Sequence, residues 1–428
     1  MKRRVVITGL GVISPVGIGK EEFWQNLRRG KSGATTLDRV TCTDLLSHHK
    51  FGANVVCEVK DFRADEHDVP LEYQSMDRFI QFALATAHQA VQDAHLNPKS
   101  LDTKRIGVVL ATAIFGSQTM DQEFIKGTNY GQEPLCPDGI SLHLYSALMG
   151  DSAAIAIASR YGLQGECLTL STGCIAGVDA ISYAYESIAY RDQDVIITGA
   201  SEAPITPITI TAFDIINCLS CHLGDPTAAS RPFSQSRDGF VLGEGCGIVV
   251  LEELEHALHR RAPIYAEITG WDVTEHAEHM TDMSSKGVHL ARAINNALHD
   301  ASLKPCDIDF VNAHGTATPQ NDSCETMALK TALGEYAYSI PVNSTKSLQG
   351  HALAAASAME VVACAMSLQD QYIHPTINLD DPDPECDLDY VPGQGRPHAI
   401  QWLLTTASGF SGLHAVLVMG VYSAEGAH

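Results

Sequence analysis

Two stretches of the chain look like copies of one structural unit: LTLSTGCIAGVDAISYAYESI at residues 168–188 and IPVNSTKSLQGHALAAASAMEVVACAMSL at residues 340–368. Each begins as a short apolar strand, continues through a Ser-Thr pair and a polar turn, and ends in a helical pattern rich in small residues. Because small side chains let a helix approach a neighbouring backbone closely, we expect both helices to be buried. The repeat predicts a duplicated α/β unit with two central helices packed between sheets.

The rest of the chain alternates strand-like runs with helical patterns. The strand-like runs lie at residues 4–8, 105–110, 167–170, 194–197, 247–251, 264–268, 308–312, 340–343 and 403–406, and the helical patterns at 78–95, 174–190, 287–302 and 351–369. Such alternation predicts an α/β fold with largely parallel sheets covered on both faces. Residues 127–150 and 204–235 are expected to be loop-rich insertions, and since no Ser/Gly/Pro-rich linker separates the halves, we expect one body.

The bulk composition excludes several classes of protein. With 428 residues, 45% of them hydrophobic and 18% charged, the chain can build a large core and is not disordered. No run reaches the roughly 18 apolar residues of a membrane span, and the nearest, 353–368, is interrupted by Glu360. The N-terminus MKRRVVITGL enters a strand without a cleavage site, which predicts a cytoplasmic protein with no membrane partner. A net charge of −23 argues against a nucleic-acid partner.

Two motifs that suggest cofactors are incomplete. Cys218 and Cys221 form a CxxC pair, but no second pair follows at zinc-site spacing, and the twelve cysteines of a cytoplasmic chain do not indicate a disulfide framework, so we expect no metal. The segment ITGLGVISPVG at 7–17 has a dinucleotide-like start, but Ser14 replaces the third glycine and Pro15 interrupts the helix start that a phosphate site needs. We expect a tight turn there and no nucleotide.

Cys174 is the candidate nucleophile. It lies where the strand of the first copy ends and its helix begins, at the positive end of a helix dipole, which lowers the pKa of a thiol. Gly173 and Gly177 permit tight backbone geometry and close approach of a substrate, and the backbone N–H of the cysteine is available as an oxyanion donor. The alternative is a buried core thiol, which is the usual role of a free cysteine and the one we expect for Cys364.

A nucleophilic cysteine needs partner groups from elsewhere in the chain. His314, in VNAHGTATPQND, follows a strand end and precedes a glycine, a loop position typical of active sites. His351 starts the helix of the second copy and is therefore the counterpart of Cys174, and a helix N-terminus keeps an imidazole neutral. We expect Lys346 and Glu325 to form a buried pair that fixes the protonation of the two histidines.

These residues resemble those of the β-ketoacyl synthases of the thiolase fold, and the resemblance runs from about residue 3 to residue 420. The family's Cys–His–His set is matched by Cys174, His314 and His351. Further matches are the lysine of STKSLQGH (Lys346), the glutamate of NDSCET (Glu325), RPFSQSRDGFVLGEG at 231–245, and the glycine-flanked Phe410 of SGFSG. The resemblance implies a five-layered αβαβα core made of two duplicated halves, residues 1–255 with the cysteine and residues 256–428 with the two histidines.

The resemblance also implies an acyltransferase that performs a decarboxylative Claisen condensation. Cys174 would take an acyl chain from an acyl carrier protein, with the N–H groups of Cys174 and Phe410 as oxyanion donors and the Phe410 side chain as a gate. The two histidines would stabilise the enolate that forms when malonyl carrier protein loses CO₂. No metal or bound cofactor is implied: the phosphopantetheine arm arrives on the carrier, and Thr316 and Thr318 match the threonines that grip it.

Within the family, STGCIAGVDA, SEAPITPITITAFDIINCLS and DPDPECDLDYVP are most similar to the catalytic alpha subunit of type II polyketide synthases. That resemblance implies a heterodimer, joined at the strand before Cys174, with a chain-length factor, a homologous subunit that lacks the cysteine. The alternatives are a homodimeric 3-oxoacyl-[acyl-carrier-protein] synthase II of fatty-acid elongation and a non-enzymatic chain-length-factor scaffold, which Cys174 disfavours.

The docking site for the carrier is not evident from the sequence. Fatty-acid elongators carry a basic cluster before the M-D-x-F-x-Q motif, whereas this chain has VPLEYQSMDRFIQ, with Arg78 as its one basic residue. We therefore expect docking to fall to other residues or to the partner subunit. Arg78 itself is expected to form a single exposed ion pair with the acidic carrier, so that reversing its charge changes affinity only modestly.

Overall fold

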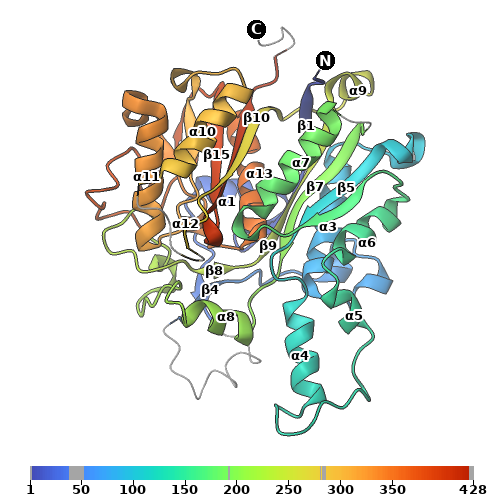
Figure 1. Ribbon diagram of the computed structural model, residues 1–428. Helices are drawn as coiled ribbons and strands as arrows, with labels where there is room; N and C mark the ends of the chain where they lie inside the picture. The colour runs from blue at the N-terminus through green and yellow to red at the C-terminus, as the bar shows by residue number, and fades with distance from the viewer. Residues whose placement is uncertain (1, 38–52, 191–192, 280, 282–285, 424–428) are drawn as a thin grey trace.

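The computed structural model describes residues 2–37, 53–190, 193–279, 281 and 286–423 (Figure 1). Its largest sheet has the strand order β12 (Val342–Asn343), β11 (Phe310–Asn312), β15 (Trp402–Ser408), β16 (Leu413–Gly420), β10 (Ala266–Glu275), β1 (Val5–Ser14), β9 (Gly245–Glu253), β7 (Val195–Glu202), β5 (Ile106–Ala111) and β6 (Cys167–Leu170), with β2 (Gly17–Ile18) paired to β1. Every predicted strand-like run overlaps one of these strands. β16 is a further strand that the sequence analysis did not predict.

The strand pairing repeats, which confirms the predicted duplication. On one side β6, β5 and β7 are parallel neighbours and are followed by antiparallel β9 and β1. On the other side β12, β11 and β15 are parallel neighbours and are followed by antiparallel β16 and β10. Two five-stranded units of the same topology therefore meet where β1 pairs with β10.

The expectation of largely parallel sheets is wrong, because each unit is mixed. β15 and β16 show the reason: only the residues between Ser408 and Leu413 connect them, and a connection that short joins antiparallel strands, whereas parallel strands need a long crossover. The antiparallel strands matter for the site, because this short connection carries Phe410.

The helices complete five layers. α7 (Ala176–Tyr190) and α13 (Ala354–Asp370) lie between the two units in the centre of the molecule (Figure 1). α3 (Arg78–Asp93) and α6 (Ser152–Tyr161) pack on the outer face of the β1–β9–β7–β5 unit. α10 (Val288–Asp300) packs on β10 and β16, and α11 (Pro319–Leu333) packs beside α10. The order α-β-α-β-α is the predicted thiolase arrangement.

The two central helices touch through small residues. A Cβ added at Gly177 would lie 2.6 Å from the Ala354 carbonyl oxygen, so only glycine permits this approach. The Ser357 hydroxyl donates to the Cys174 carbonyl at 3.2 Å and accepts the Val178 N–H at 3.2 Å. The predicted burial of both small-residue helices is confirmed, and their contact fixes the backbone from Cys174 into the first turn of α7.

The segment ITGLGVISPVG is mostly strand rather than turn. Val5–Ser14 forms the continuous strand β1, and the turn into β2 is confined to the last residues of the segment. A Cβ at Gly9 or Gly11 would lie 2.2 Å from the carbonyl oxygens of Ala90 and Thr86 in α3. The expected turn is therefore wrong for most of the segment: its glycines make room for α3 to lie against the strand.

The two stretches expected to be loop-rich are mostly irregular, and each contains one short α-helix. α4 (Ser117–Gly127) and α5 (His143–Leu148) form an arm that extends from the body, with α8 (Pro207–Asp214) facing it (Figure 1). The remaining short elements are α1 (Lys20–Arg28), α9 (Leu254–His259), α12 (Lys346–Gln349), β3 (Thr35–Thr36), β4 (Val55–Cys57), β8 (Leu242–Gly243), β13 (Tyr372–Ile373) and β14 (Arg396–Pro397).

Three further observations concern the described residues only. None of their helices is long and apolar enough to cross a membrane. They contain no group of three or more His, Cys, Asp or Glu side chains arranged to hold a metal ion. Their eleven cysteines are all free, and Cys42 lies outside the described residues.

Arg78 is not an exposed docking residue. Its guanidinium lies 3.0 Å from the fully buried carboxylate of Glu244, donates to the Val59 carbonyl at 2.5 Å and stands over the Phe82 ring. The expected exposed ion pair with a carrier is therefore wrong, because the buried carboxylate holds the guanidinium inside the protein. Reversing the charge of Arg78 would set two carboxylates against each other and disturb the fold.

We expect Arg78→Met to lower the free energy of unfolding by about 3 kcal/mol, because it leaves the Glu244 carboxylate buried without its guanidinium partner. Urea unfolding followed by circular dichroism measures the loss. Arg63→Met is the matched control, since Arg63 pairs with Asp65 and Glu66 at the surface and should leave the unfolding midpoint unchanged. Equal midpoints for the two variants would contradict a structural role for Arg78.

Candidate active site

Cys174 lies in a 3₁₀ turn, η5 (Gly173–Ile175), between the edge strand β6 and the central helix α7. Gly173 has φ +65°, a left-handed conformation that redirects the chain from strand to helix. The cysteine is 7% exposed, and two backbone N–H groups, its own and that of Phe410, lie near the sulfur and favour its negative charge. Two donors that converge beside a nucleophile are placed to hold an oxyanion formed on its substrate.

Burial raises the pKa of the Cys174 thiol to about 12. The positive charge of Lys346 and the two N–H groups act in the opposite direction, but desolvation is the larger effect. The expected lowering of the thiol pKa by the helix start is therefore wrong for this closed site. An apolar enclosure disfavours the thiolate more than one helix end favours it, so the resting cysteine is a thiol.

Two histidine rings from the other half of the chain lie beside the cysteine. The centroids of His314, which follows β11, and His351 are 5.3 Å apart, and the ring planes stand at 87° to each other. The prediction that His351 starts a helix is wrong by three residues, because α13 begins at Ala354. The His351 N–H instead donates to the Val241 carbonyl at 2.8 Å, which keeps this residue in extended backbone before the helix.

Lys346 links His314 to a buried acid that the sequence analysis did not select. The ammonium lies 3.1 Å from His314 Nδ1 and 2.6 Å from Glu360 Oε1, and all three side chains are buried. Because an ammonium only donates, Nδ1 accepts, and the His314 proton is on Nε2. The expected Lys346–Glu325 pair is wrong, since α12 sets the lysine against the side of α13 from which Glu360 projects. The sequence alone could have pointed to Glu360, because it is the single charged residue in an otherwise apolar helical run.

Glu325 supports the site in a different way. Its fully buried carboxylate accepts the N–H groups of His314 and Gly315, each at 2.8 Å, and the Thr406 hydroxyl at 2.5 Å. These bonds tie the loop after β11 to both α11 and β15. Glu325 therefore positions the backbone of His314 rather than the proton on its ring.

Both histidines are neutral at ordinary pH. Burial, and after it the charge of Lys346, holds the pKa of His314 and of His351 well below the usual value for histidine. A neutral imidazole with one N–H can donate a hydrogen bond to a developing negative charge without itself carrying a charge into the apolar pocket. Two such donors close together suit the stabilisation of an enolate oxygen.

The site opens into two cavities that share Cys174 and Phe410. The first has several polar side chains in its walls, which include Phe240, His314, Thr316, Thr318, Asn321 and His351. Within it the hydroxyls of Thr316 and Thr318 hydrogen-bond to each other at 2.8 Å. The second is mainly apolar, and its walls include Ala113, Ile114, Phe213, Leu353 and Leu413. Because Phe410 lines both, it stands between the two cavities.

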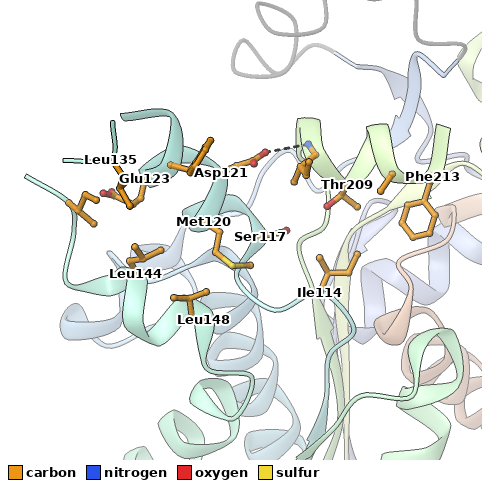
Figure 2. A pocket seen from close by; sticks show the side chains of 14 residues that line it. Ile114, Ser117, Met120, Asp121, Glu123, Leu135, Leu144, Leu148, Thr209 and Phe213 are labelled. Carbon is orange, nitrogen blue, oxygen red and sulfur yellow. Dashed lines mark hydrogen bonds between the residues drawn. The ribbon is translucent and has the colours of Figure 1, made fainter. Parts of the chain in front are cut away.

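A third cavity continues beyond the apolar one. It lies between α4, α5 and α8 and shares Ile114 and Phe213 with the inner cavity. Figure 2 shows Met120, Leu144 and Leu148 lining it on the side of the arm and Phe213 on the side of α8. The three cavities follow one another and together form a mostly apolar space that starts at Cys174.

A duplicated five-layered fold with a cysteine at the start of a central helix defines the thiolase-fold acyl-transferring enzymes. Within that class, the chain belongs to the β-ketoacyl synthase family. The family's N-terminal domain model matches residues 2–257, and its C-terminal domain model matches residues 265–380.

Similar proteins cover almost the whole chain. A polyketide beta-ketoacyl synthase 1 of Streptomyces halstedii is 42% identical over 98% of this chain and 98% of its own length. The 3-oxoacyl-[acyl-carrier-protein] synthase 2 of a Synechocystis strain is 40% identical over 98% of this chain and 99% of its own length. Identity alone therefore does not separate the polyketide and fatty-acid branches.

Two solved structures are also close. One is the ketosynthase in a complex of a type II polyketide synthase acyl-carrier protein with its ketosynthase bound to the hexaketide; it is 43% identical with a TM-score of 0.92, over 99% of this chain and 100% of that chain. The other, from the ishigamide ketosynthase/chain length factor, is 33% identical with a TM-score of 0.89, over 99% of this chain and 100% of that chain.

Proposed function

We propose that this protein is the catalytic ketosynthase subunit of a type II polyketide synthase and that it condenses malonyl units with a chain held on Cys174. The observation that carries the proposal is a thiol placed between two N–H donors and beside two neutral histidines in one buried pocket. The similarity to polyketide ketosynthases along nearly the whole chain supports the product class.

In the first half-reaction, the Cys174 sulfur attacks the thioester carbonyl of an acyl chain on a carrier protein. The bond between that carbonyl carbon and the sulfur of the carrier's phosphopantetheine breaks, and the thiol proton ends on the departing sulfur. The N–H groups of Cys174 and Phe410 hold the oxyanion that forms on the way. Because the resting thiol is protonated, a neutral histidine beside it is the nearest group able to relay the proton.

In the second half-reaction, malonyl carrier protein enters the first cavity. The bond between C2 and the free carboxylate breaks, CO₂ leaves, and the electron pair forms an enolate. His314, through Nε2–H, and His351 donate to the enolate oxygen. The enolate carbon then attacks the acyl carbon, the cysteine sulfur leaves and regains a proton, and a 3-oxoacyl chain two carbons longer remains on the carrier.

We propose that the two cavities bind different parts of the substrate. The phosphopantetheine arm is a part of the carrier substrate and lies in the first cavity, where Thr316 and Thr318 offer hydroxyls to its amides. The acyl chain lies on the other side of Phe410, among apolar side chains that reach to Ile114 and the cavity of the arm. One solved neighbour is a complex of a carrier protein with its ketosynthase, which supports a carrier as the delivering partner.

The edge of the sheet supports a second subunit. Among the described residues β6 pairs with β5 alone, so its other edge is open. α6, which packs on β6, exposes Ile155, and the arm exposes Leu142 and Tyr145. An open strand edge close to exposed large apolar side chains is a surface that a partner covers. We propose a chain-length factor as this partner, the pairing named for one solved neighbour.

Expression with and without the partner tests the proposal. We expect the chain alone to be poorly soluble and inactive, and co-expression with a cysteine-free homologous subunit to give a soluble heterodimer that extends acyl carrier protein with malonyl units. Size-exclusion chromatography and mass spectrometry of the carrier-bound products measure both. A soluble homodimer that elongates saturated acyl chains unaided would overturn the polyketide assignment in favour of a fatty-acid 3-oxoacyl synthase.

A further inference from the structure

A group of histidines outside the proposed chemistry lies beside the loop that carries Phe410. The ring centroid of His276 is 5.9 Å from that of His289 and 6.1 Å from that of His414. His414 Nδ1 in turn lies 2.9 Å from the hydroxyl of Ser408, the last residue of β15 before the loop. Of these residues, His276, His414 and Ser408 are buried.

His276 touches the loop at Gly412 in two ways. Its backbone N–H donates to the Gly412 carbonyl at 3.2 Å. Its ring edge faces the glycine, since a Cβ built at Gly412 would lie 2.3 Å from both Nε2 and Cδ2 of the imidazole. Gly412 also has φ +80°, which only glycine adopts readily. The loop therefore closes onto the histidine ring with no room for a side chain.

One atom of His276 is left without a partner. Nδ1 accepts the Glu278 N–H at 2.9 Å, so the proton of the neutral ring is on Nε2. Nε2 is buried and has no hydrogen-bond partner in the part of the chain that the structure describes. A buried donor without an acceptor raises the free energy of the state that buries it. The contact with Gly412 therefore holds the loop in place. The unpaired Nε2–H makes this closed position less stable than it would be with an acceptor.

The position of Phe410 shows why such a contact is needed. Phe410 lines both cavities beside Cys174, so an acyl chain that moves from one cavity to the other must pass it. Its N–H lies near the Cys174 sulfur and favours negative charge there, so the loop must be in this position for that donor to hold an oxyanion. The loop therefore needs an open position for loading and a reproducible closed position for chemistry.

We propose that His276 is a positioning residue that latches the Phe410 loop in its closed position through Gly412; this inference rests on the proposed ketosynthase function. When the loop closes, the Phe410 N–H lies beside the Cys174 sulfur. Opening releases the Gly412 carbonyl and exposes Nε2–H to water, which supplies the missing acceptor.

A double-mutant cycle between His276 and Gly412 tests the latch. In Gly412→Ala the new methyl meets the imidazole, so we expect kcat for acyl transfer to Cys174 to fall about 100-fold with little change in KM for the acyl carrier. His276→Ala should lose about tenfold. In the double variant the methyl no longer meets the ring, so kcat should recover part of the loss; the positive φ of residue 412 still strains the alanine, so recovery should stop short of the level of His276→Ala alone. His299→Ala, an exposed histidine on α10, is the control and should be unaffected.

A second measurement reports the loop position without any natural substrate. Iodoacetamide labelling of Cys174, followed by peptide mass spectrometry, should be about fivefold faster or more in both single variants, because an open loop exposes the sulfur. His276→Gln, whose flexible side chain can yield to the methyl, should rescue Gly412→Ala in the same way and serves if His276→Ala is unstable.

The outcomes separate the two proposals. Losses of kcat that multiply in the double variant, with labelling rates equal to wild type, would overturn the latch. If the wild-type heterodimer transfers no acyl group, the ketosynthase proposal fails, and the labelling rates alone then decide whether His276 holds the loop.

Discussion

Replacing Cys174 by alanine should lower the rate of acyl transfer to the protein by about 10⁴-fold or more, because no other group in the pocket can form the thioester. The fold should survive, since the substitution removes one sulfur atom from a site that already borders a cavity. Intact-protein mass spectrometry after incubation with an acyl carrier protein detects the acyl adduct directly. Thermal unfolding of the variant should match that of the wild type.

Cys246→Ala is the matched control for this experiment. Cys246 is also buried and free, but it lies in β9 and lines none of the cavities around Cys174. We expect it to retain acyl transfer, and Cys174→Ala to retain decarboxylation of malonyl carrier protein, because both histidines remain in place. Persistence of the acyl adduct in Cys174→Ala, mapped to another cysteine, would refute the nucleophile assignment.

Replacing His314 or His351 by alanine should lower the rate of malonyl decarboxylation by about 10²–10³-fold, the usual cost of one donor to a developing oxyanion. Acylation of Cys174 should fall less, because its oxyanion is held by backbone N–H groups that both variants keep. Release of CO₂ from malonyl carrier protein and formation of the acyl adduct measure the two half-reactions separately. Equal losses in both would contradict this division.

The pH dependence of decarboxylation tests the protonation state that the structure assigns. Burial and Lys346 hold the pKa of both histidines well below the usual value, so the neutral form persists as the pH falls. The activity carried by neutral imidazole is lost only as the pH falls through the lowered pKa. We therefore expect a flat rate from about pH 8 to about pH 6, where an ordinary histidine would already titrate. A midpoint near the ordinary histidine value would contradict the assigned environment.

The sequence alone predicted the residues to which we assign the chemistry, and the structure brings Cys174, His314 and His351 into one pocket. Cys174 and His314 each lie next to a strand end, and together with the motifs around Lys346, Glu325 and Phe410 they form the set that resembles the ketosynthase family. Local patterns revealed the duplication and the two buried helices. Such features depend on residues close together in the chain, so they can be recognised without the tertiary structure.

Only the tertiary structure decided which groups act on those residues. Lys346 pairs with Glu360 rather than Glu325 because the geometry between α12 and α13, not spacing in the chain, determines which carboxylate it meets. The same is true of Arg78, whose partner Glu244 is distant in sequence.

The pKa of Cys174 also followed from the tertiary structure. The helix start that favours a thiolate is a local feature, but the desolvation that overrides it comes from side chains contributed by several segments of the chain. The burial of a side chain and its contacts with residues distant in sequence depend on the whole fold. The sequence by itself therefore determined which residues we assign to the chemistry, whereas the tertiary structure determined their protonation, their partners and the contacts of the Phe410 loop.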